Sequence, residues 1–396
     1  MLERRLLAAV AVPARDEADS LRSCLEALAR QLGGHGWAIE PSAFAVLVFA
    51  NNCTDATARV AREFAAGSPV RVAVLQAALP PERSHAGGAR RGAMDAAAAL
   101  LEDRPGAALL STDADGRVAP DWLAANLAAL AAGADAVAGA IGFDAAELAA
   151  LPPALRAREE REAAYAALLD RMAWLIDPDP HDPWPRHGIH SGASMALTLD
   201  AYRRIGGLPA VPVGEDRALF DAVRRAGMRV RHCPEARVTV SCRLVGRAPG
   251  GMADTLLRRD LDAAAPTDTR LEPAADAFWR FRCRRVFRRA QSGAGRPGDV
   301  LRLSFALRLP TEAVARAARE PRFWQAWHAL EGASPALARR VVPAPALARE
   351  ARIAKLVLAA IGAAPAASKV APPRRGPPRP PAAADRGGSA RTVPAG

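Results

Sequence analysis

The first half of the chain alternates short apolar runs with stretches of helical periodicity, and this alternation restricts the fold more than any other feature. The apolar runs, each short enough for a buried strand, are Leu6–Val12, Ala43–Ala50, Val70–Leu75, Ala107–Ser111 and Ala134–Ala138. The helical stretches between them are Ser20–Leu32, Asp55–Ala65, Gly87–Leu101 and Pro120–Ala131. This pattern predicts an α/β fold, with a mostly parallel, Rossmann-like sheet covered by helices on both faces.

The second half changes from this alternation to a helical, arginine-rich pattern. The segments expected first are a helix at Ala154–Ile176, a proline-broken loop at Asp177–Arg186, a strand at Ile189–Leu199, a helix at Glu215–Ala226 and a strand at Arg229–His232. The helices expected after them are Thr255–Leu261, Asp276–Arg289, Thr311–Ala318, Pro321–Glu331 and Ala346–Ile361. We therefore predict a first domain over residues 1–245, a helical C-terminal extension over 246–362, and a disordered Pro/Ala/Arg-rich tail over 363–396.

The composition favours a soluble chain that does not bind nucleic acid. The formal net charge is +12, but no nucleic-acid recognition motif accompanies it, so we do not expect nucleic acid as a partner. No strongly apolar run is long enough to cross a bilayer, and five cysteines without metal-ligand spacing indicate free thiols. We expect a cytoplasmic chain, and the positive charge leaves peripheral contact with the inner face of the membrane open.

Two aspartates, Asp113 and Asp115, come directly after the apolar run Ala107–Ser111. In extended backbone, residues i and i+2 project to the same side, so both carboxylates can face one ligand. Such hard oxygen ligands suit Mg²⁺ or Mn²⁺, which completes its shell with water and a phosphorylated substrate. The pair can also be ordinary turn acids, because aspartate is favoured where strands end.

Other polar segments also fall at the ends of predicted strands. The Arg15–Glu17 loop follows the first strand, and Asn51–Asp55 follows the second. In open α/β sheets ligands bind beyond the carboxyl ends of the strands, so we expect these segments to meet Asp113–Asp115 at one site. Arg90 lies at the start of a predicted helix, where a cation is unfavourable unless it meets an anion such as a diphosphate.

Five segments resemble, in order, the motifs of the family 2 glycosyltransferases with the GT-A fold. They are Val10–Glu17 (similar to V-x-V-P-x-x-[ND]-E), Asn52–Thr57 (S/C-T-D-x-T), Gly88–Arg90 (the helix start G-x-A-R), Ser111–Gly116 (the D-x-D region), and Gly206–Pro209 with Gly214–Asp216 (G-G-[FL]-x…E-D). Each motif alone is weak, but five in this order at family spacing are specific. The resemblance covers roughly residues 6 to 245.

The resemblance implies an inverting transfer of sugar from a nucleotide-sugar donor to an acceptor hydroxyl. It assigns to the donor Pro13, Arg15, Glu17, Asn51, Asn52, Asp55, Gly88, Arg90, Asp113, Ala114 and Asp115. It also implies that Asp115, with Asp113, binds the metal, and that Asp216 is the general base, with Glu215 orienting it or binding the acceptor. Residues on the acceptor side, or able to bind phosphate, are Trp184, Ser191, Gly192, Arg243 and Arg247.

Several of these residues have simpler explanations that the sequence leaves open. Asp55 and Asp216 can act only as caps of the helices that follow them. Arg15, Arg243 and Arg247 can be solvated charges, and the loop containing Ser191 can pack on the sheet without touching an acceptor. The sequence also leaves open two other functions. One is a nucleotidyltransferase on a similar fold, which would require a glycine-rich loop after the first strand. The other is a non-catalytic nucleotide-sugar binder.

The chain departs from the family pattern at two positions. Asn51 stands near the place where the family has an aspartate that contacts the nucleobase, so the donor nucleotide stays open. His232 lies where many relatives supply a further metal ligand, but its apolar surroundings favour a histidine outside the metal site.

Overall fold

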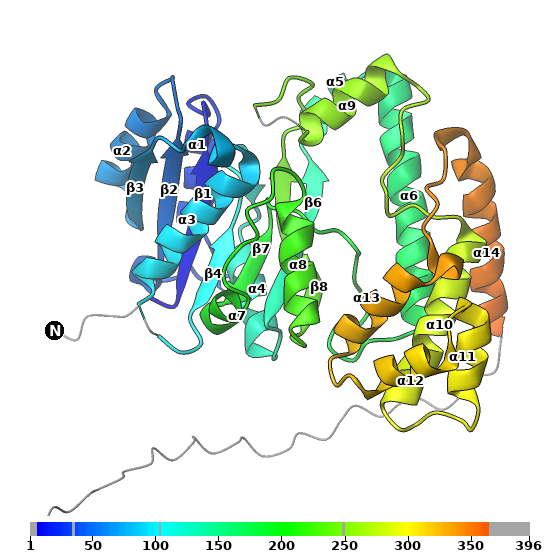
Figure 1. Ribbon diagram of the computed structural model, residues 1–396. Helices are drawn as coiled ribbons and strands as arrows, with labels where there is room; N and C mark the ends of the chain where they lie inside the picture. Colours follow the sequence, from blue (N-terminus) through cyan, green and yellow to red (C-terminus); the bar gives the residue numbers. More distant parts are fainter. Residues whose placement is uncertain (1–5, 34–35, 103, 248–249, 364–396) are drawn as a thin grey trace, which may run out of the picture. The chain divides into compact units, whose positions relative to one another are not determined.

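The computed structural model describes residues 6–33, 36–102, 104–247 and 250–363 (Figure 1), and these residues belong to one compact unit. The predicted disordered tail lies, from residue 364 on, outside the described residues. The strands are β1 (Ala8–Ala14), β2 (Phe44–Asn51), β3 (Arg71–Ala77), β4 (Ala108–Ser111), β5 (Arg117–Val118), β6 (Ala136–Phe143), β7 (Met195–Thr198) and β8 (Val230–Val240). The helices of the first part are α1 (Leu21–Ala29), α2 (Thr57–Gly67), α3 (Ala86–Leu100), α4 (Trp122–Ala131), α5 (Ala145–Ala150), α6 (Pro153–Ile176), α7 (Leu199–Arg204) and α8 (Glu215–Arg225).

The described strands form one mixed sheet in the order β3-β2-β1-β4-β7-β6-β8-β5. The neighbours of β1 and β2 are parallel to them, and β6 is parallel to β8, whereas β7 runs antiparallel between β4 and β6. The predicted α/β fold with a mostly parallel sheet is confirmed. Because β1, β2 and β4 are parallel, the loops after them emerge at one edge of the sheet.

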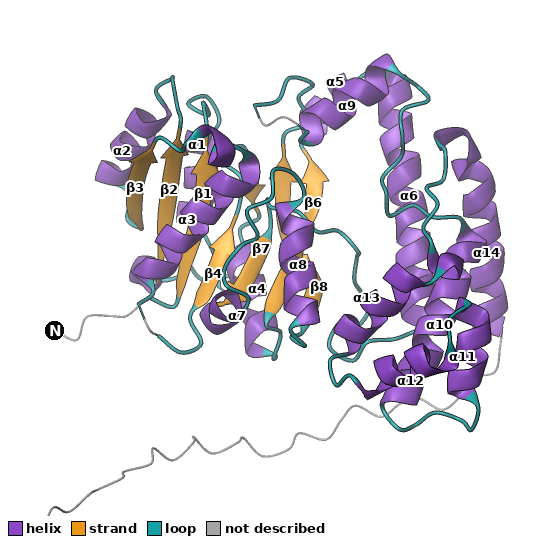
Figure 2. Ribbon diagram, in the orientation of Figure 1, coloured by secondary structure: helices purple, strands orange, loops and turns teal. Residues whose placement is uncertain are grey.

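Each face of the sheet is buried under its own helices, as Figure 2 shows. Alternate residues of β1 point to opposite faces, so Val10 packs with α1 and α4, whereas Ala11 packs with α3 and α8. The fully buried side chains Leu25 of α1 and Met94 of α3 belong to these two separate cores. A parallel sheet buried on both faces explains why its strands read as continuous apolar runs.

Two of the predicted strands differ most from their expected bounds. The strand expected at Ile189–Leu199 is only β7, Met195–Thr198, because residues before it form a loop whose Gly192 carbonyl accepts a hydrogen bond from Arg90. The strand expected at Arg229–His232 continues to Val240 as β8, paired with β6 across an irregularity at Gly139/Ala140.

The extension consists of helices that pack on one another and in part on the long helix α6. They are α9 (Met252–Leu261), α10 (Ala274–Gln291), α11 (Asp299–Leu307), α12 (Thr311–Arg319), α13 (Phe323–Ala333) and α14 (Leu347–Ala363). Helices α10 and α14 contact α6 through an apolar core that includes Tyr165 and Phe281. Sequence periodicity did not predict α11. No described helix has both the length and the apolarity needed to cross a membrane.

Several arginines of the extension form ion pairs with buried acids. Arg280 is buried and lies 3.0 Å from Glu272 and 2.9 Å from Glu331. Arg284 and Arg288 both bind Asp177, the residue that follows α6, at 2.5 and 2.9 Å. These arginines hold the extension together, so the net charge of the chain overstates what is free to bind an anionic partner.

The buried hydroxyl of Ser194 should contribute to the stability of the sheet. It accepts a hydrogen bond from the Trp122 indole N–H at 2.8 Å and donates one to the Ala236 carbonyl at 3.1 Å. We predict that Ser194→Ala lowers the free energy of unfolding by about 1–3 kcal/mol, because both partners stay buried without a hydrogen bond. Urea denaturation measures this, with Ser191→Ala in the half-buried loop as the control; an equal loss in both variants would contradict the prediction.

Candidate active site

The loops after β1 and β2 are tied together by two aspartates. The Asp16 carboxylate accepts hydrogen bonds from the backbone N–H groups of Thr54 at 2.7 Å and Asp55 at 3.2 Å. Asp55 in turn accepts from the N–H groups of Ala18 at 3.0 Å and Thr57 at 2.8 Å. Asp55 therefore has a clear structural role at the start of α2, and its predicted donor contact stays a prediction.

Asp16 was not among the sequence candidates, although it lies inside the Val10–Glu17 motif. Oxygens of Asp16 and Asp55 and the sulfur of Cys53 lie within 4.8 Å of one another, so this group could hold a metal ion. The backbone hydrogen bonds that both carboxylates already accept give the group a structural explanation.

The two asparagines after β2 behave differently. Asn52 clamps the chain at Leu79, donating to its carbonyl at 3.0 Å and accepting from its N–H at 3.1 Å. Asn51 is buried, and its side-chain oxygen has no hydrogen-bond partner among the described residues. An unpaired buried amide oxygen is costly, which makes Asn51 the better of the two candidates for a ligand contact.

Arg90 connects three parts of the site from its place in the second turn of α3. Its guanidinium group contacts Asp113 at 2.6 Å, Glu215 at 3.1 Å, the Ser111 hydroxyl at 3.0 Å and the Gly192 carbonyl at 2.9 Å. Burial favours the neutral form of Arg90, but the two carboxylates outweigh it and raise the pKa of the guanidinium group. Arg90 was expected to meet an anion at this position, and Asp113 and Glu215 of the protein itself supply it.

Glycine is required at two positions around this arginine. A Cβ atom at Gly192 would lie 2.3 Å from Cζ of Arg90, so only glycine lets the loop before β7 approach the guanidinium group. A Cβ atom at Gly88 would lie 2.1 Å from the Arg83 carbonyl oxygen. Close packing against the chain before α3 thus explains why residue 88 is a glycine, and the contact of Gly88 with the donor stays a prediction.

The D-x-D segment presents its two acids and buries the residue between them. Ala114 packs in the core, whereas the Asp113 and Asp115 side chains are about one third and one fifth exposed, at 34% and 21%. Burial and the nearby charges of Asp113 and Glu17 raise the pKa of Asp115, and Arg243 offsets this only in part. A cation bound beside Asp115 would oppose both effects, because it favours the charged carboxylate.

Glu17 holds two arginines from the segment after β8. Its buried carboxylate lies 2.7 Å from Arg243 and also pairs with Arg247, and Arg243 lies 3.1 Å from Asp115. The structure thus brings Arg243 and Arg247 to the D-x-D segment, and they are not solvated linker charges. Arg15 is more exposed, and its guanidinium group donates to the Ser84 carbonyl at 3.3 Å.

Helix α8 begins at the other side of Arg90. Glu215 is buried against Arg90, and Asp216 beside it accepts the Arg217 N–H at 2.6 Å. Burial, and then the charge of Glu215, raise the pKa of Asp216. A carboxylate with a raised pKa is suited to accept a proton near neutral pH. The next residue, Arg217, reaches the Thr269 hydroxyl of the extension at 3.4 Å, so the extension borders this side of the site.

Comparison with known families decides what kind of domain this is. A model of the family described as "Glycosyl transferase family 2" matches residues 9–182. This region belongs to glycosyl transferase family 2. The match begins in β1 and includes Glu17, Arg90, Asp113 and Asp115, but it ends before Asp216. The chain is therefore a glycosyltransferase, and the roles of residues beyond 182 depend on their geometry.

Solved structures with a similar fold are distant. A mannosyltransferase from Pyrobaculum calidifontis, solved with GDP-Man and Mn²⁺, is 17% identical over 89% of this chain and 81% of its own, with a TM-score of 0.43. TarS 1-349 from S. aureus, solved with UDP-GlcNAc, is 14% identical over 83% of this chain and 93% of its own, also with a TM-score of 0.43. No curated protein sequence matches the chain.

Two predicted residues of the glycosyltransferase have local contacts that explain them without an acceptor. Trp184 is half-exposed and lies against Trp174 and the guanidinium group of Arg171, with centroid distances of 5.8 Å between the rings and 4.5 Å to Arg171. The Ser191 hydroxyl accepts the Ala193 N–H at 3.3 Å within its own loop. Their acceptor roles stay predictions.

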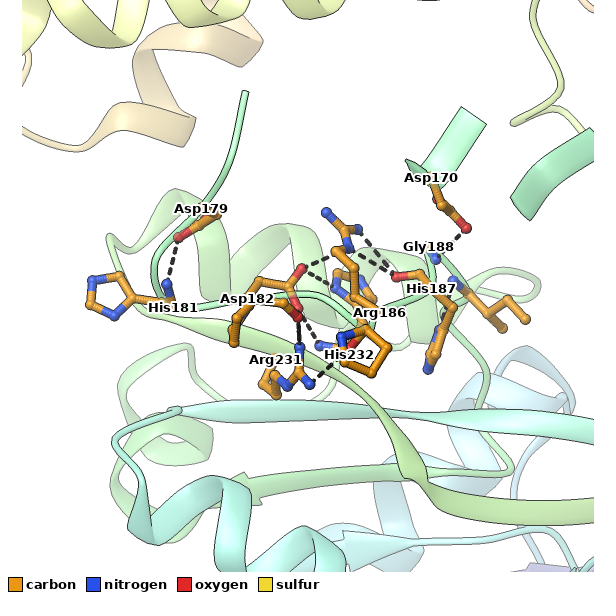
Figure 3. A network of polar contacts seen from close by, with 12 residues as sticks. Asp170, Asp179, His181, Asp182, Arg186, His187, Gly188, Arg231 and His232 are labelled. Atoms are coloured by element: carbon orange, nitrogen blue, oxygen red, sulfur yellow. Dashed lines mark hydrogen bonds and ion pairs between the residues drawn. The ribbon is translucent and has the colours of Figure 1, made fainter. Parts of the chain in front are cut away.

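His232 is part of a separate buried network of the glycosyltransferase, shown in Figure 3. Its Nδ1 lies 2.7 Å from Asp182, and its Nε2 faces His190 at 3.1 Å and Arg224 at 3.3 Å. Burial, and then the nearby arginines, lower the pKa of His232 well below its ordinary value. Both ring nitrogens are engaged within the protein, in keeping with the expectation that His232 lies outside the metal site.

The contacts of Arg90 predict a large effect on stability. Arg90→Ala should lower the free energy of unfolding by about 3–5 kcal/mol, because Asp113 and Glu215 then stay in place without their cation. Denaturant unfolding measures this, with Arg59→Ala as the control. Arg59 forms an exposed pair with Glu63 at 2.8 Å, for which we expect less than about 1 kcal/mol. Equal losses would show that Arg90 has no central role.

Proposed function

We propose that the chain is an inverting, divalent-metal-dependent transferase that moves a sugar from a nucleoside-diphosphate sugar to an acceptor hydroxyl. The supporting observation is the Arg90 network, which ties the D-x-D segment to the first turn of α8. Through Arg90, Asp113, which can bind a cation, is connected to Glu215. Glu215 is followed by Asp216, the carboxylate with a raised pKa. The family match supports sugar transfer over nucleotidyl transfer.

The residues present fit a divalent cation. Asp113 and Asp115 offer hard carboxylate ligands, and each of their ion pairs with arginine uses one carboxylate oxygen. Burial, and then the charges of Asp113 and Glu17, raise the pKa of Asp115, and a bound cation would favour its charged form. Asp115 and Asp113 would hold Mg²⁺ or Mn²⁺, which supplies charge stabilisation for a diphosphate leaving group when bound.

Asp216 is the general base in this proposal. Its carboxylate takes the proton of the acceptor hydroxyl while the acceptor oxygen bonds to the anomeric carbon. The bond from that carbon to the donor diphosphate breaks on the opposite face, and the nucleoside diphosphate leaves with the electron pair. Burial raises the pKa of Asp216, and the charge of Glu215 raises it further. The start of α8 is fixed by Arg90, so the base has a fixed position.

The setting of the reaction follows the expectations from sequence. We propose a cytoplasmic location, which the free state of all five cysteines supports. The acceptor is a hydroxyl compound bound between α8 and the loop of Ser191 and Gly192, next to the Thr269 contact of the extension.

Two substitutions separate donor binding from transfer. We predict that Asp115→Asn abolishes the Mn²⁺-dependent increase in Tm produced by the bound donor, because the metal loses a charged ligand. Asp216→Asn should keep this increase and lose transfer by at least about a hundredfold. UDP- and GDP-sugars are screened by thermal shift with Mn²⁺ or EDTA, and transfer is followed as release of nucleoside diphosphate. Full turnover by Asp216→Asn would refute the base assignment, and donor binding without turnover in the unchanged chain would favour the non-catalytic binder.

The raised pKa of Asp216 predicts the acid side of the pH profile. A base works only when deprotonated, so transfer should be lost as the pH falls through a value above the ordinary aspartate pKa of about 4. Glu215→Gln removes a like charge beside Asp216 and should move this acid limb of the pH profile to lower pH. The measurement is kcat/KM against pH, with Asp221→Asn later in the same helix as the control. A limb that moves equally in both variants, or not at all, would contradict the assignment.

A further inference from the structure

The segment after β8 places two guanidinium groups against Glu17, and only one of them also contacts an acid of the D-x-D loop. One nitrogen of Arg243 lies 2.7 Å from Oε1 of Glu17 and 3.1 Å from Oδ2 of Asp115, and its other terminal nitrogen donates to Oε2 of Glu17 at 3.3 Å. Arg247 pairs with Glu17 and, among the ion pairs of the described residues, has no contact with Asp115. Arg243 therefore has two carboxylate partners, and Arg247 shares one of them.

The two partners of Arg243 differ in burial. The Glu17 side chain is only 9% exposed, and its own backbone N–H is held by the Thr57 hydroxyl at 2.8 Å. The Arg243 and Asp115 side chains are more open, at 30% and 21%. Glu17 is thus a fixed anchor for Arg243, whereas the contact between Arg243 and Asp115 lies nearer the solvent and can separate.

Arg243 contacts the carboxylate that the proposed function assigns to the metal. Two positive groups near one carboxylate repel each other, and the repulsion is strong where water is partly excluded. A divalent ion on Asp115 and the present position of Arg243 are therefore in conflict. When Arg243 leaves Asp115, it stays attached to Glu17 and keeps donors for another anion.

We propose that Arg243 is a positioning residue that occupies Asp115 in the free chain and exchanges there with the divalent ion. Released from Asp115 but held by Glu17, Arg243 turns to the diphosphate of the donor. This inference rests on the proposed function, because it takes Asp115 as the metal ligand. This exchange makes the binding of the metal and the binding of the donor cooperative. Each of them favours the state in which Arg243 has left Asp115, and so each favours the binding of the other.

The test measures Mn²⁺ binding by the electron paramagnetic resonance signal of the free ion, without nucleotide. Arg243→Gln removes the charge and keeps a hydrogen-bond donor for Glu17, and Arg243→Ala removes both. Both variants should bind Mn²⁺ about threefold to tenfold more tightly than the unchanged chain, because a competing cation is lost. At saturating Mn²⁺ both should bind UDP or GDP, whichever binds the unchanged chain, several-fold more weakly.

Arg247→Ala is the matched control, since it removes the same charge from the same anchor without an Asp115 contact. Its Mn²⁺ affinity should change by less than about twofold. Equal Mn²⁺ affinity in the Arg243 variants and the unchanged chain would overturn the exchange and leave the proposed function standing. Weaker Mn²⁺ binding in the Arg243 variants would overturn it as well. Failure of the unchanged chain and every variant to bind Mn²⁺ would overturn both proposals.

Discussion

The buried guanidinium group of Arg90 is the contact on which the geometry of the site depends. Its partners come from β4 and the loop after it, the loop before β7, and the first turn of α8. These segments are distant in sequence, and Glu215 lies 125 positions from Arg90. A planar group with several donors in a fixed arrangement can hold such segments in one geometry, which a flexible lysine cannot do. The proposed metal ligands and the proposed base are thereby fixed relative to each other before any substrate binds.

The charges around this centre explain why the site is prepared for a cation and an anion together. Glu17, Asp113, Asp115, Glu215 and Asp216 supply five carboxylates, and Arg90, Arg243 and Arg247 supply three guanidinium groups. Arg90 is fully enclosed by its protein partners, whereas Arg243 and Arg247 are partly exposed on Glu17. Burial, and then the neighbouring acids, raise the pKa values of Asp115 and Asp216. Carboxylates with perturbed pKa values are concentrated at functional sites.

Much of the fold could be predicted from sequence because its signals are local. The runs that became β1, β2 and β4 are short and apolar, and a strand buried on both faces requires that pattern. The short β7 was overestimated because its preceding residues, such as Gly192, look like strand residues although their polar groups bind Arg90. The arginine-rich extension was predicted as helical, but the acids that neutralise it, such as Asp177 for Arg284, depend on tertiary contacts.

The site was also predictable only as far as its signals are local in the sequence. Its location at the carboxyl ends of the strands follows from the alternation pattern, and Arg90 was expected to meet an anion. Sequence could not show that the anions are Asp113 and Glu215, nor that Glu17 anchors Arg243, because these pairs join distant segments. Asp16 was missed because it makes its hydrogen bonds to backbone groups of the next loop, and nothing in the residue types reveals that.

The central claim is that Asp113, which Arg90 holds in place, and Asp115 beside it form the cation site, and anomalous diffraction tests it most directly. Crystals grown with Mn²⁺ and a nucleoside diphosphate, measured at the manganese absorption edge, should show an anomalous peak in contact with Asp115. Oxygens of Asp16 and Asp55 offer a competing place for an ion in the same chain. A peak there, with none at Asp115, would contradict the account.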